Sequence, residues 1–577
     1  MVKFLLGVLS GILLTFFFAI FIVLVAAMLG SGGPAVEQGS VLTVRLRGDI
    51  PEHVGTQFTL DWIRSGPPPT LLDLRNALKK AAADGRISAL ALHFSGLGTG
   101  WAKAEEIRYG IESFKKSGKP VIAYLSRAHT MDYYVASAAD EIFMASEDLL
   151  DVKGLRAEVT FFADTLEKIG VEAEMERIGK YKSAAEAFSR SSMSDEYREV
   201  VNSMLDDVYA RFITTVAASR SKTEDEIRQI IDQGPFLAAD AVEAGLLDGL
   251  KYGDEFEDYL KAKIDQDELR EITFRKYHQS LLSPADLRGG PEIAVVYAVG
   301  AIMAGRSEQD PFSGSRIVGA ESFNKTLRSV REDDDVKAVI LRVDSPGGDA
   351  FASDLMWREV NLLRAEKPLI VSMSDVAASG GYYISMAQAP VLAYPGTTTG
   401  SIGVFYGKLN LRGLYDKLGI KKEIVTRGKF AAIDTDYRAM TAAEREKMQQ
   451  EIRAFYDAFV RKVADSRGRE WAAIDEVAQG RVWMGSQAHE QGLVDELGGF
   501  DRAIEMAQQA AGLDDGAFRL VPYPASQDLF EALFDSDGFA WTQAMDFPLP
   551  SALRSVLSPS LPQGGILRLA PYSITVQ

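Results

Sequence analysis

Apolar residues occur along this chain in short blocks that alternate with amphipathic segments. The blocks at 87–94 and 336–343 are almost continuously apolar, which is typical of strands buried on both faces of a parallel sheet. Residues 104–116 and 352–364 instead repeat apolar positions with helical spacing. Strands that alternate with helices predict an α/β fold with mostly parallel sheets and right-handed crossovers.

The same order of motifs is written twice at a nearly constant spacing. Residues 133–137 (Tyr-Tyr-Val-Ala-Ser) correspond to 382–386 (Tyr-Tyr-Ile-Ser-Met), and 179–181 (Gly-Lys-Tyr) to 428–430 (Gly-Lys-Phe), both at an offset of 249. A shared offset over separate stretches indicates an internal duplication, so each copy is expected to form a similar α/β unit.

The duplication predicts the domain organisation. We place the first repeat at 40–285 and the second at 290–525, with a Gly/Pro-containing break between them. Residues 526–577 contain several prolines, each of which removes a backbone donor, so this tail is expected to be irregular.

The N-terminus carries a long apolar run. Residues 4–29 contain no charge, and 26 helical residues would extend about 39 Å, enough to cross a bilayer core of about 30 Å. We therefore expect a membrane anchor at 1–30 and a linker at 31–39. Small residues at 26–30 leave a cleaved signal peptide as the alternative. Lys3 predicts a cytoplasmic N-terminus, with the rest of the chain beyond the membrane.

Composition excludes several classes of function. The net charge of −18, without a stripe of Lys and Arg, disfavours nucleic acid as a partner. The chain has no cysteine, and its five histidines show no zinc-binding spacing, so we expect neither a metal site nor a cofactor. His129 is interpreted as a neighbour of a lost site and not as a base.

A glycine-containing loop differs between the two copies. In the second copy Asp-Ser-Pro-Gly-Gly at 344–348 follows a strand and precedes a helix, where glycine N–H groups can face an oxyanion. We expect Gly347 and Gly348 to contribute to an oxyanion hole. The first copy has Thr99 where the second has Gly348.

A serine and a lysine show complementary losses between the copies. Ser379, followed by Gly380, corresponds to Thr130 in the first copy, whereas Lys182 corresponds to Ala431 in the second. Alone, such a serine usually packs against a helix and such a lysine is usually solvated. Together they predict Ser379 as nucleophile, Lys182 as general base and the Gly380 N–H as an oxyanion donor. The lysine would have to be neutral, with its pKa lowered from about 10.4 by burial.

These motifs, from the anchor through both repeats, resemble the long, duplicated form of signal peptide peptidase A (protease IV), of the Clp-protease and crotonase-like superfamily. The resemblance implies that Ser379 is the nucleophile, Lys182 the base, and Gly347 and Gly348 parts of the oxyanion hole. It further implies a homotetramer on the bacterial inner membrane, with periplasmic catalytic domains that degrade cleaved signal peptides and other short hydrophobic peptides.

Other readings of the sequence stay open. A crotonase-like acyl-CoA enzyme would use the same oxyanion architecture without a serine nucleophile, and an inactive membrane scaffold would need neither Ser379 nor Lys182. A membrane protease with a Clp-like domain and several C-terminal spans is disfavoured, because the chain has no second apolar run of about 20 residues.

Overall fold

A computed structural model describes residues 35–54, 68–280, 290–309, 316–514 and 518–524, the backbone of strands at 565–569 and 575–576, and positions 11 and 15. The expected anchor at 4–29 lies outside the described residues apart from those two positions. None of the helices within the described ranges is long and apolar enough to cross a membrane.

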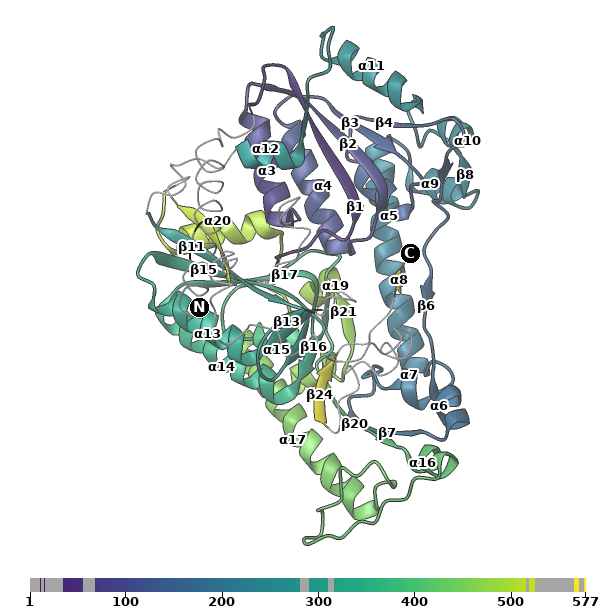
Figure 1. The fold of residues 1–577 in the computed structure, drawn as a ribbon, viewed down its shortest axis with the longest axis vertical. Coiled ribbons are helices and arrows are strands. Elements are labelled where there is room, and N and C mark those ends of the chain that lie inside the picture. Colours follow the sequence, from purple (N-terminus) through teal and green to yellow (C-terminus); the bar gives the residue numbers. More distant parts are fainter. Residues whose placement is uncertain are drawn as a thin grey trace.

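The first repeat is built on a six-stranded sheet in which every neighbouring pair is parallel (Figure 1). Its strands, in spatial order, are β10 (Glu271–Thr273), β1 (Ser40–Gly48), β2 (Ile87–Leu97), β3 (Val121–Leu125), β4 (Glu141–Met144) and β9 (Gly249–Leu250). Alternate residues of β2 enter different cores: Leu90 and Leu92 pack with helices α3 (Leu71–Ala83) and α4 (Trp101–Lys115). Ala89 and Ala91 pack on the opposite face.

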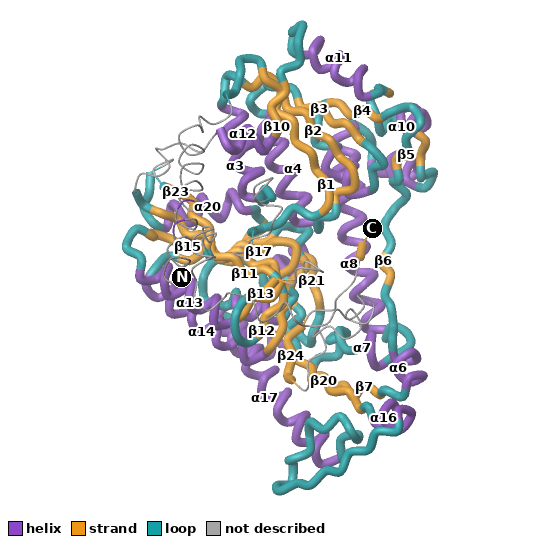
Figure 2. Tube along the Cα trace, viewed as in Figure 1, coloured by secondary structure: helices purple, strands orange, loops and turns teal. Residues whose placement is uncertain are grey.

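The second repeat has the same plan. Its main sheet runs in the order β21 (Val482–Met484), β19 (Thr398–Gly400), β17 (Leu369–Ala378), β15 (Val336–Ser345), β11 (Glu292–Val299) and β23 (Arg519–Tyr523). Helices α13 (Ala320–Glu332) and α14 (Ala350–Glu366) lie on one face and α20 (Phe500–Ala510) on the other (Figure 2). The parallel pairing of β11, β15, β17 and β19 confirms the expected α/β fold with mostly parallel sheets.

A third sheet combines strands from both repeats. Strand β7 (Glu172–Ile178) of the first repeat pairs antiparallel with β20 (Val404–Asn410) of the second. On the other side of β20 lies β24 (Gly565–Leu569), which also pairs antiparallel with β16 (Gly347–Asp349). The tail expected to be irregular therefore contributes a strand, and Gly347 and Gly348 of the expected oxyanion loop form a strand that pairs with it.

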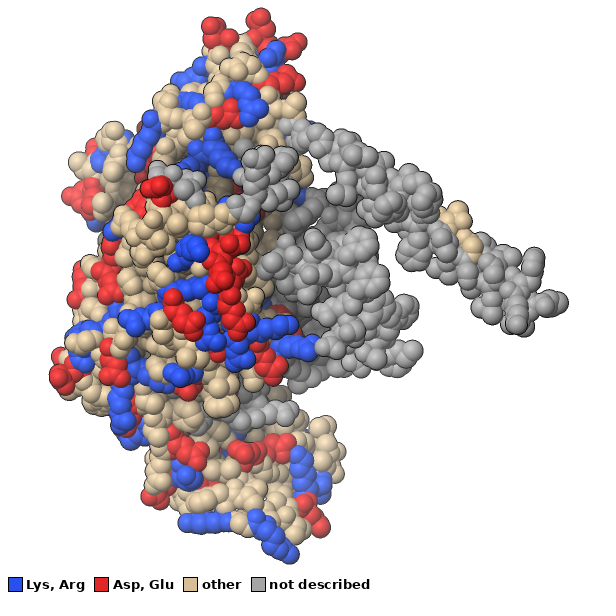
Figure 3. Space-filling view, turned by 90° about the vertical axis from the view of Figure 1, so that its left-hand side faces the viewer, with Lys and Arg blue, Asp and Glu red and all other residues tan. Residues whose placement is uncertain are grey.

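Helix α8 (Asp195–Arg220) also joins the repeats. It extends from the first sheet along the side of the molecule towards β7 (Figure 1). Its buried Val200, Met204 and Val208 pack against Val482 and Met484 of β21. Acidic and basic side chains are intermixed over the face drawn in Figure 3, so that face carries no continuous band of one charge.

Candidate active site

Ser379 lies at a sharp turn between β17 and the short helix α15 (Gly380–Ile384). Its backbone has φ 54° and ψ −112°, a conformation that non-glycine residues rarely adopt and that is common at functional sites. The turn is held on both sides, since the Ser379 N–H donates to Gly400 O at 2.8 Å and its carbonyl accepts from Tyr383 N at 2.8 Å. The side chain is fully buried.

Lys182 meets this serine from the first repeat. Its Nζ donates to Ser379 Oγ at 2.8 Å, and to the Oγ and the backbone carbonyl of Ser401, each at 3.0 Å. The lysine side chain has no exposed surface. These three contacts are to uncharged oxygens.

Close backbone packing fixes the approach of Lys182. Tyr181 N donates to Gln479 O at 2.8 Å, so the lysine-bearing segment is bonded directly to the second repeat. A Cβ at Gly480 would lie 2.6 Å from the Lys182 Cβ, which only glycine avoids. The backbone of the second repeat therefore fixes the position from which the lysine reaches Ser379.

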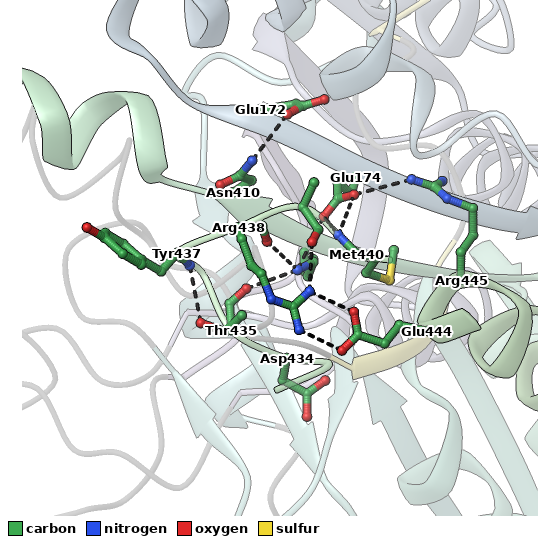
Figure 4. Close-up of polar contacts among 12 residues, drawn as sticks. Glu172, Glu174, Asn410, Asp434, Thr435, Tyr437, Arg438, Met440, Glu444 and Arg445 are labelled. Carbon is green, nitrogen blue, oxygen red and sulfur yellow. Dashed lines mark hydrogen bonds and ion pairs between the residues drawn. The ribbon is translucent and has the colours of Figure 1, made fainter. Parts of the chain in front are cut away.

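Strand β7, which leads to Lys182, is anchored by charged side chains (Figure 4). Glu174 accepts from Met440 N at 3.0 Å and forms ion pairs with Lys408 at 3.2 Å and Arg445 at 3.2 Å. Glu174 and Lys408 are both buried. These contacts hold β7 of the first repeat against strand β20 and helix α17 (Ala442–Arg467) of the second.

The expected oxyanion residues lie beside the serine. A Cβ at Gly348 would be 1.9 Å from Ile302 O, so that position requires glycine. A Cβ at Gly380 would be 2.6 Å from Ser353 Oγ and 3.1 Å from Gly348 N, so a side chain there would displace its neighbours. The Gly347 N–H donates to Ser345 Oγ at 3.2 Å, so this amide already has an acceptor. The structure thus brings Ser379, Lys182 and all three glycines together.

Ser401 is the site residue that sequence reasoning missed. It is fully buried, has φ 52°, and its N–H donates to Arg481 O at 2.7 Å. Its counterpart at the offset of 249 is Val152, so the signal was the same kind of departure that marked Ser379. A serine in a Thr/Gly-rich turn is too ordinary for that difference to be noticed without the fold.

The site combines a strained serine, Ser379, with a buried amine that donates to its hydroxyl, and glycine amides lie beside it. On this α/β fold, these features are those of a serine peptidase. The sequence pattern of peptidase family S49 matches residues 113–267 and 361–514, one stretch in each repeat. The chain belongs to peptidase family S49.

Named relatives cover most of the chain. The chain is 40% identical over 485 residues to "Serine protease SPPA, chloroplastic" of Arabidopsis thaliana, covering 83% of this chain and 70% of that protein. It is 33% identical over 505 residues to "Protease 4" of Salmonella typhi, covering 85% and 78%. Among solved structures, ClpP1 from Listeria monocytogenes aligns at 15% identity with a TM-score of 0.22, covering 36% of this chain and 91% of that chain. The resemblance to signal peptide peptidase A is confirmed at the level of the family.

Proposed function

We propose that this chain is a membrane-anchored endopeptidase whose catalytic dyad is Ser379 and Lys182. The observation that carries the proposal is the 2.8 Å hydrogen bond between Lys182 Nζ and Ser379 Oγ, because it joins a possible base to a possible nucleophile inside a fully buried site. The acyl-CoA and scaffold alternatives account for neither the strained serine nor the buried lysine.

In the proposed mechanism the neutral amine of Lys182 accepts the proton of Ser379 as Oγ attacks a peptide carbonyl. The N–H groups of Gly348 and Gly380 stabilise the oxyanion of the tetrahedral intermediate. The ammonium then donates its proton to the leaving amine, which leaves an acyl-enzyme. A water that transfers its proton to Lys182 hydrolyses the ester, and Ser379 recovers its proton. Ser401 holds the amine in place throughout.

Strand β24 supports an extended mode of substrate binding. It lies antiparallel between β16 and β20, with Gly348 opposite Arg568 and Phe405 opposite Leu567 in the register. An extended peptide that took the place of β24 would pair with β16 and lie along the oxyanion loop. We infer that short hydrophobic peptides, including signal peptides left by earlier cleavage, are substrates, as the resemblance implies.

The proposed location follows from the N-terminal sequence. The 26 uncharged residues at 4–29 would anchor the chain in the inner membrane of a bacterium, with the catalytic repeats on the periplasmic side. A site held there would receive peptides as they leave the bilayer.

Labelling of the serine tests the proposed function. The full chain in detergent is treated with a fluorophosphonate, digested and analysed by mass spectrometry, while hydrolysis of an apolar peptide is followed in parallel. We expect one modified residue, Ser379, and loss of hydrolysis in proportion to labelling, whereas Ser379→Ala should be neither labelled nor active. An unlabelled Ser379 in a chain that hydrolyses peptides would overturn the dyad. Binding of an acyl-CoA thioester without labelling would favour the crotonase-like alternative, and neither activity would favour the scaffold.

The duplication also supports self-association into a homotetramer. Strand β7 pairs with β20, but the counterpart of β7 at 421–427 forms no strand in the described structure, and its Val425 is 85% exposed. The counterpart of β20 is 155–161, so we propose that 421–427 of one copy pairs with 155–161 of the next. Such a head-to-tail contact repeats until a ring closes.

Charge placed in this segment tests the assembly. Val425→Asp should shift the detergent-solubilised chain from a tetramer to a monomer in light scattering, because a carboxylate would be buried in the new strand pair. Glu423→Asp, in the same segment and without a change of charge, is the matched control and should stay tetrameric. An assembly that is unchanged by Val425→Asp would exclude this interface.

A further inference from the structure

Lys103 lies at a second junction between the repeats. It belongs to the first turn of α4 in the first repeat and is 5% exposed. Its Nζ lies 3.0 Å from Asp344 Oδ2 and 3.5 Å from Asp375 Oδ2, both in the second repeat, and 3.6 Å from Asp49 Oδ1. One buried ammonium therefore links two carboxylates of the other copy.

In the sequence, the two carboxylates come shortly before the glycine loop and the serine turn of the candidate active site. Asp344 is the second-last residue of β15 and precedes the loop at 345–348, while Asp375 is on β17 four residues before Ser379. The Asp344 carboxylate also accepts from Val376 N at 3.1 Å, which ties the two strands to each other. The position of this pair therefore sets where the glycine loop and the serine turn begin.

Asp375 also caps the helix that carries Lys103. Its carboxylate accepts from Gly100 N at 3.0 Å and Lys103 N at 2.9 Å, at the positive end of the 15-residue helix α4. A Cβ at Gly100 would lie 2.3 Å from the Asp375 carboxyl carbon, so this approach requires glycine. Asp375 of the second repeat and the start of α4 in the first repeat are therefore in close contact.

The duplication shows the same kind of complementary loss here as at the dyad. At the offset of 249, Lys103 corresponds to Ala352 and Asp344 to Ser95. Each copy keeps one half of the ion pair and has lost the other half. A pair needed only for the stability of each α/β unit would be expected within a copy, whereas the 3.0 Å pair of Lys103 with Asp344 joins the two copies; the contact of Lys103 with Asp49 of its own copy is longer, at 3.6 Å.

We propose that Lys103 is a positioning residue of the peptidase site, which holds the Asp344 and Asp375 strand ends so that the Gly348 and Gly380 amides converge on the oxyanion. The inference rests on the proposed function, since it assigns Lys103 to the geometry of that reaction. Lys103 does not contact substrate; it acts through the two strands.

The charges around Lys103 determine how its loss would depend on pH. The acids facing it are Asp49, Glu52, Asp344 and Asp375, and the cations that act on these acids include Arg316 and Arg342. Burial raises the pKa of Asp375 to about 6 despite the opposing effect of Lys103. Without Lys103, its pKa rises further, and protonation at lower pH relieves the repulsion between the carboxylates.

The test is Lys103→Met in the full chain, measured by peptide hydrolysis. We expect kcat to fall about 10- to 100-fold with KM within about threefold, because the oxyanion donors are displaced while the substrate strand still binds. The rate of fluorophosphonate labelling of Ser379 should fall in parallel. The ratio of variant to wild-type kcat, with each kcat divided by the folded fraction from circular dichroism at the same pH, should rise as pH is lowered from 8 to 6; a ratio that stays flat after this correction would mean that only folded protein is lost.

Lys115→Met is the matched control, on the same helix but 34% exposed and paired with Asp140. It should leave kcat unchanged. If Lys103→Met does not fold by circular dichroism, Asp375→Asn, which keeps the shape of the side chain, should show the same loss of kcat with unchanged KM. A folded Lys103→Met with wild-type kcat, in a chain that still requires Lys182, would overturn the role of Lys103 alone. Activity that survives loss of Lys182 would instead overturn the proposed function.

Discussion

Lys182→Met is expected to lower kcat/KM for peptide hydrolysis by about 10²- to 10⁴-fold, the usual contribution of a general base. Methionine keeps most of the apolar stem of lysine but has no amine to accept the proton of Ser379 Oγ, which lies 2.8 Å from Nζ. The measurement is steady-state hydrolysis of an apolar peptide together with the rate of fluorophosphonate labelling. Both should fall, because both require activated Ser379.

Two variants control this experiment. Lys180→Met removes a lysine two residues away that is exposed and lies over the Tyr181 ring, and it should retain activity. Lys182→Arg places a permanent cation at this position, which cannot lose its proton near neutral pH, so it should be as inactive as Lys182→Met. If Lys182→Arg were active, the residue would serve as a fixed charge and not as a base.

The parallel sheets and the duplication could be predicted because both leave signals in short, continuous stretches of sequence. Buried strands such as β2 and β15 are mostly apolar runs, and the two copies align at a nearly constant offset. The third sheet could not be predicted, since β16 has only three residues and its neighbours β12 (Ala301–Met303) and β24 come from distant segments. Pairings of this kind depend on how the two copies pack, which no local pattern encodes.

The residues of the candidate site also fall into those that the sequence predicts and those that only the fold shows. Ser379 and Lys182 could be found because each occupies a position that the other copy has changed, in a recognisable motif. Ser401 and Lys103 differ between the copies just as clearly, but a serine in a turn and a lysine in a helix are usually ordinary surface residues. Only the fold shows that both are buried at the junction, where their polar groups need partners.

The buried ion cluster between the repeats offers a second large effect, on stability. Arg342 of β15 is 1% exposed, and its guanidinium pairs with Glu52 at 2.8 Å and Glu106 at 2.6 Å, both from the first repeat. Burial raises the pKa of Glu106 to about 7 against the effect of Arg342. Burial also acts to raise the pKa of Glu52, but pairing with Arg342 leaves it below its usual value. The positive charge of Arg342 therefore offsets the energetic cost of burying the two carboxylates.

Arg342→Met should lower the free energy of unfolding by about 3–5 kcal/mol at pH 8, measured by urea denaturation, because it leaves both carboxylates buried without a cation. Their folded-state pKa values would then lie above the unfolded values, so the folded variant binds more protons. The free energy of unfolding of the variant must therefore fall as pH rises from the unfolded-state to the folded-state pKa values. Its deficit in this free energy relative to the wild type should shrink towards pH 5. Adding Glu52→Gln and Glu106→Gln to Arg342→Met removes the unpaired charges and should restore most of the stability. A deficit that is the same at pH 5 and pH 8, and unchanged in the triple variant, would show that lost packing around the guanidinium, and not its charge, holds the two repeats together.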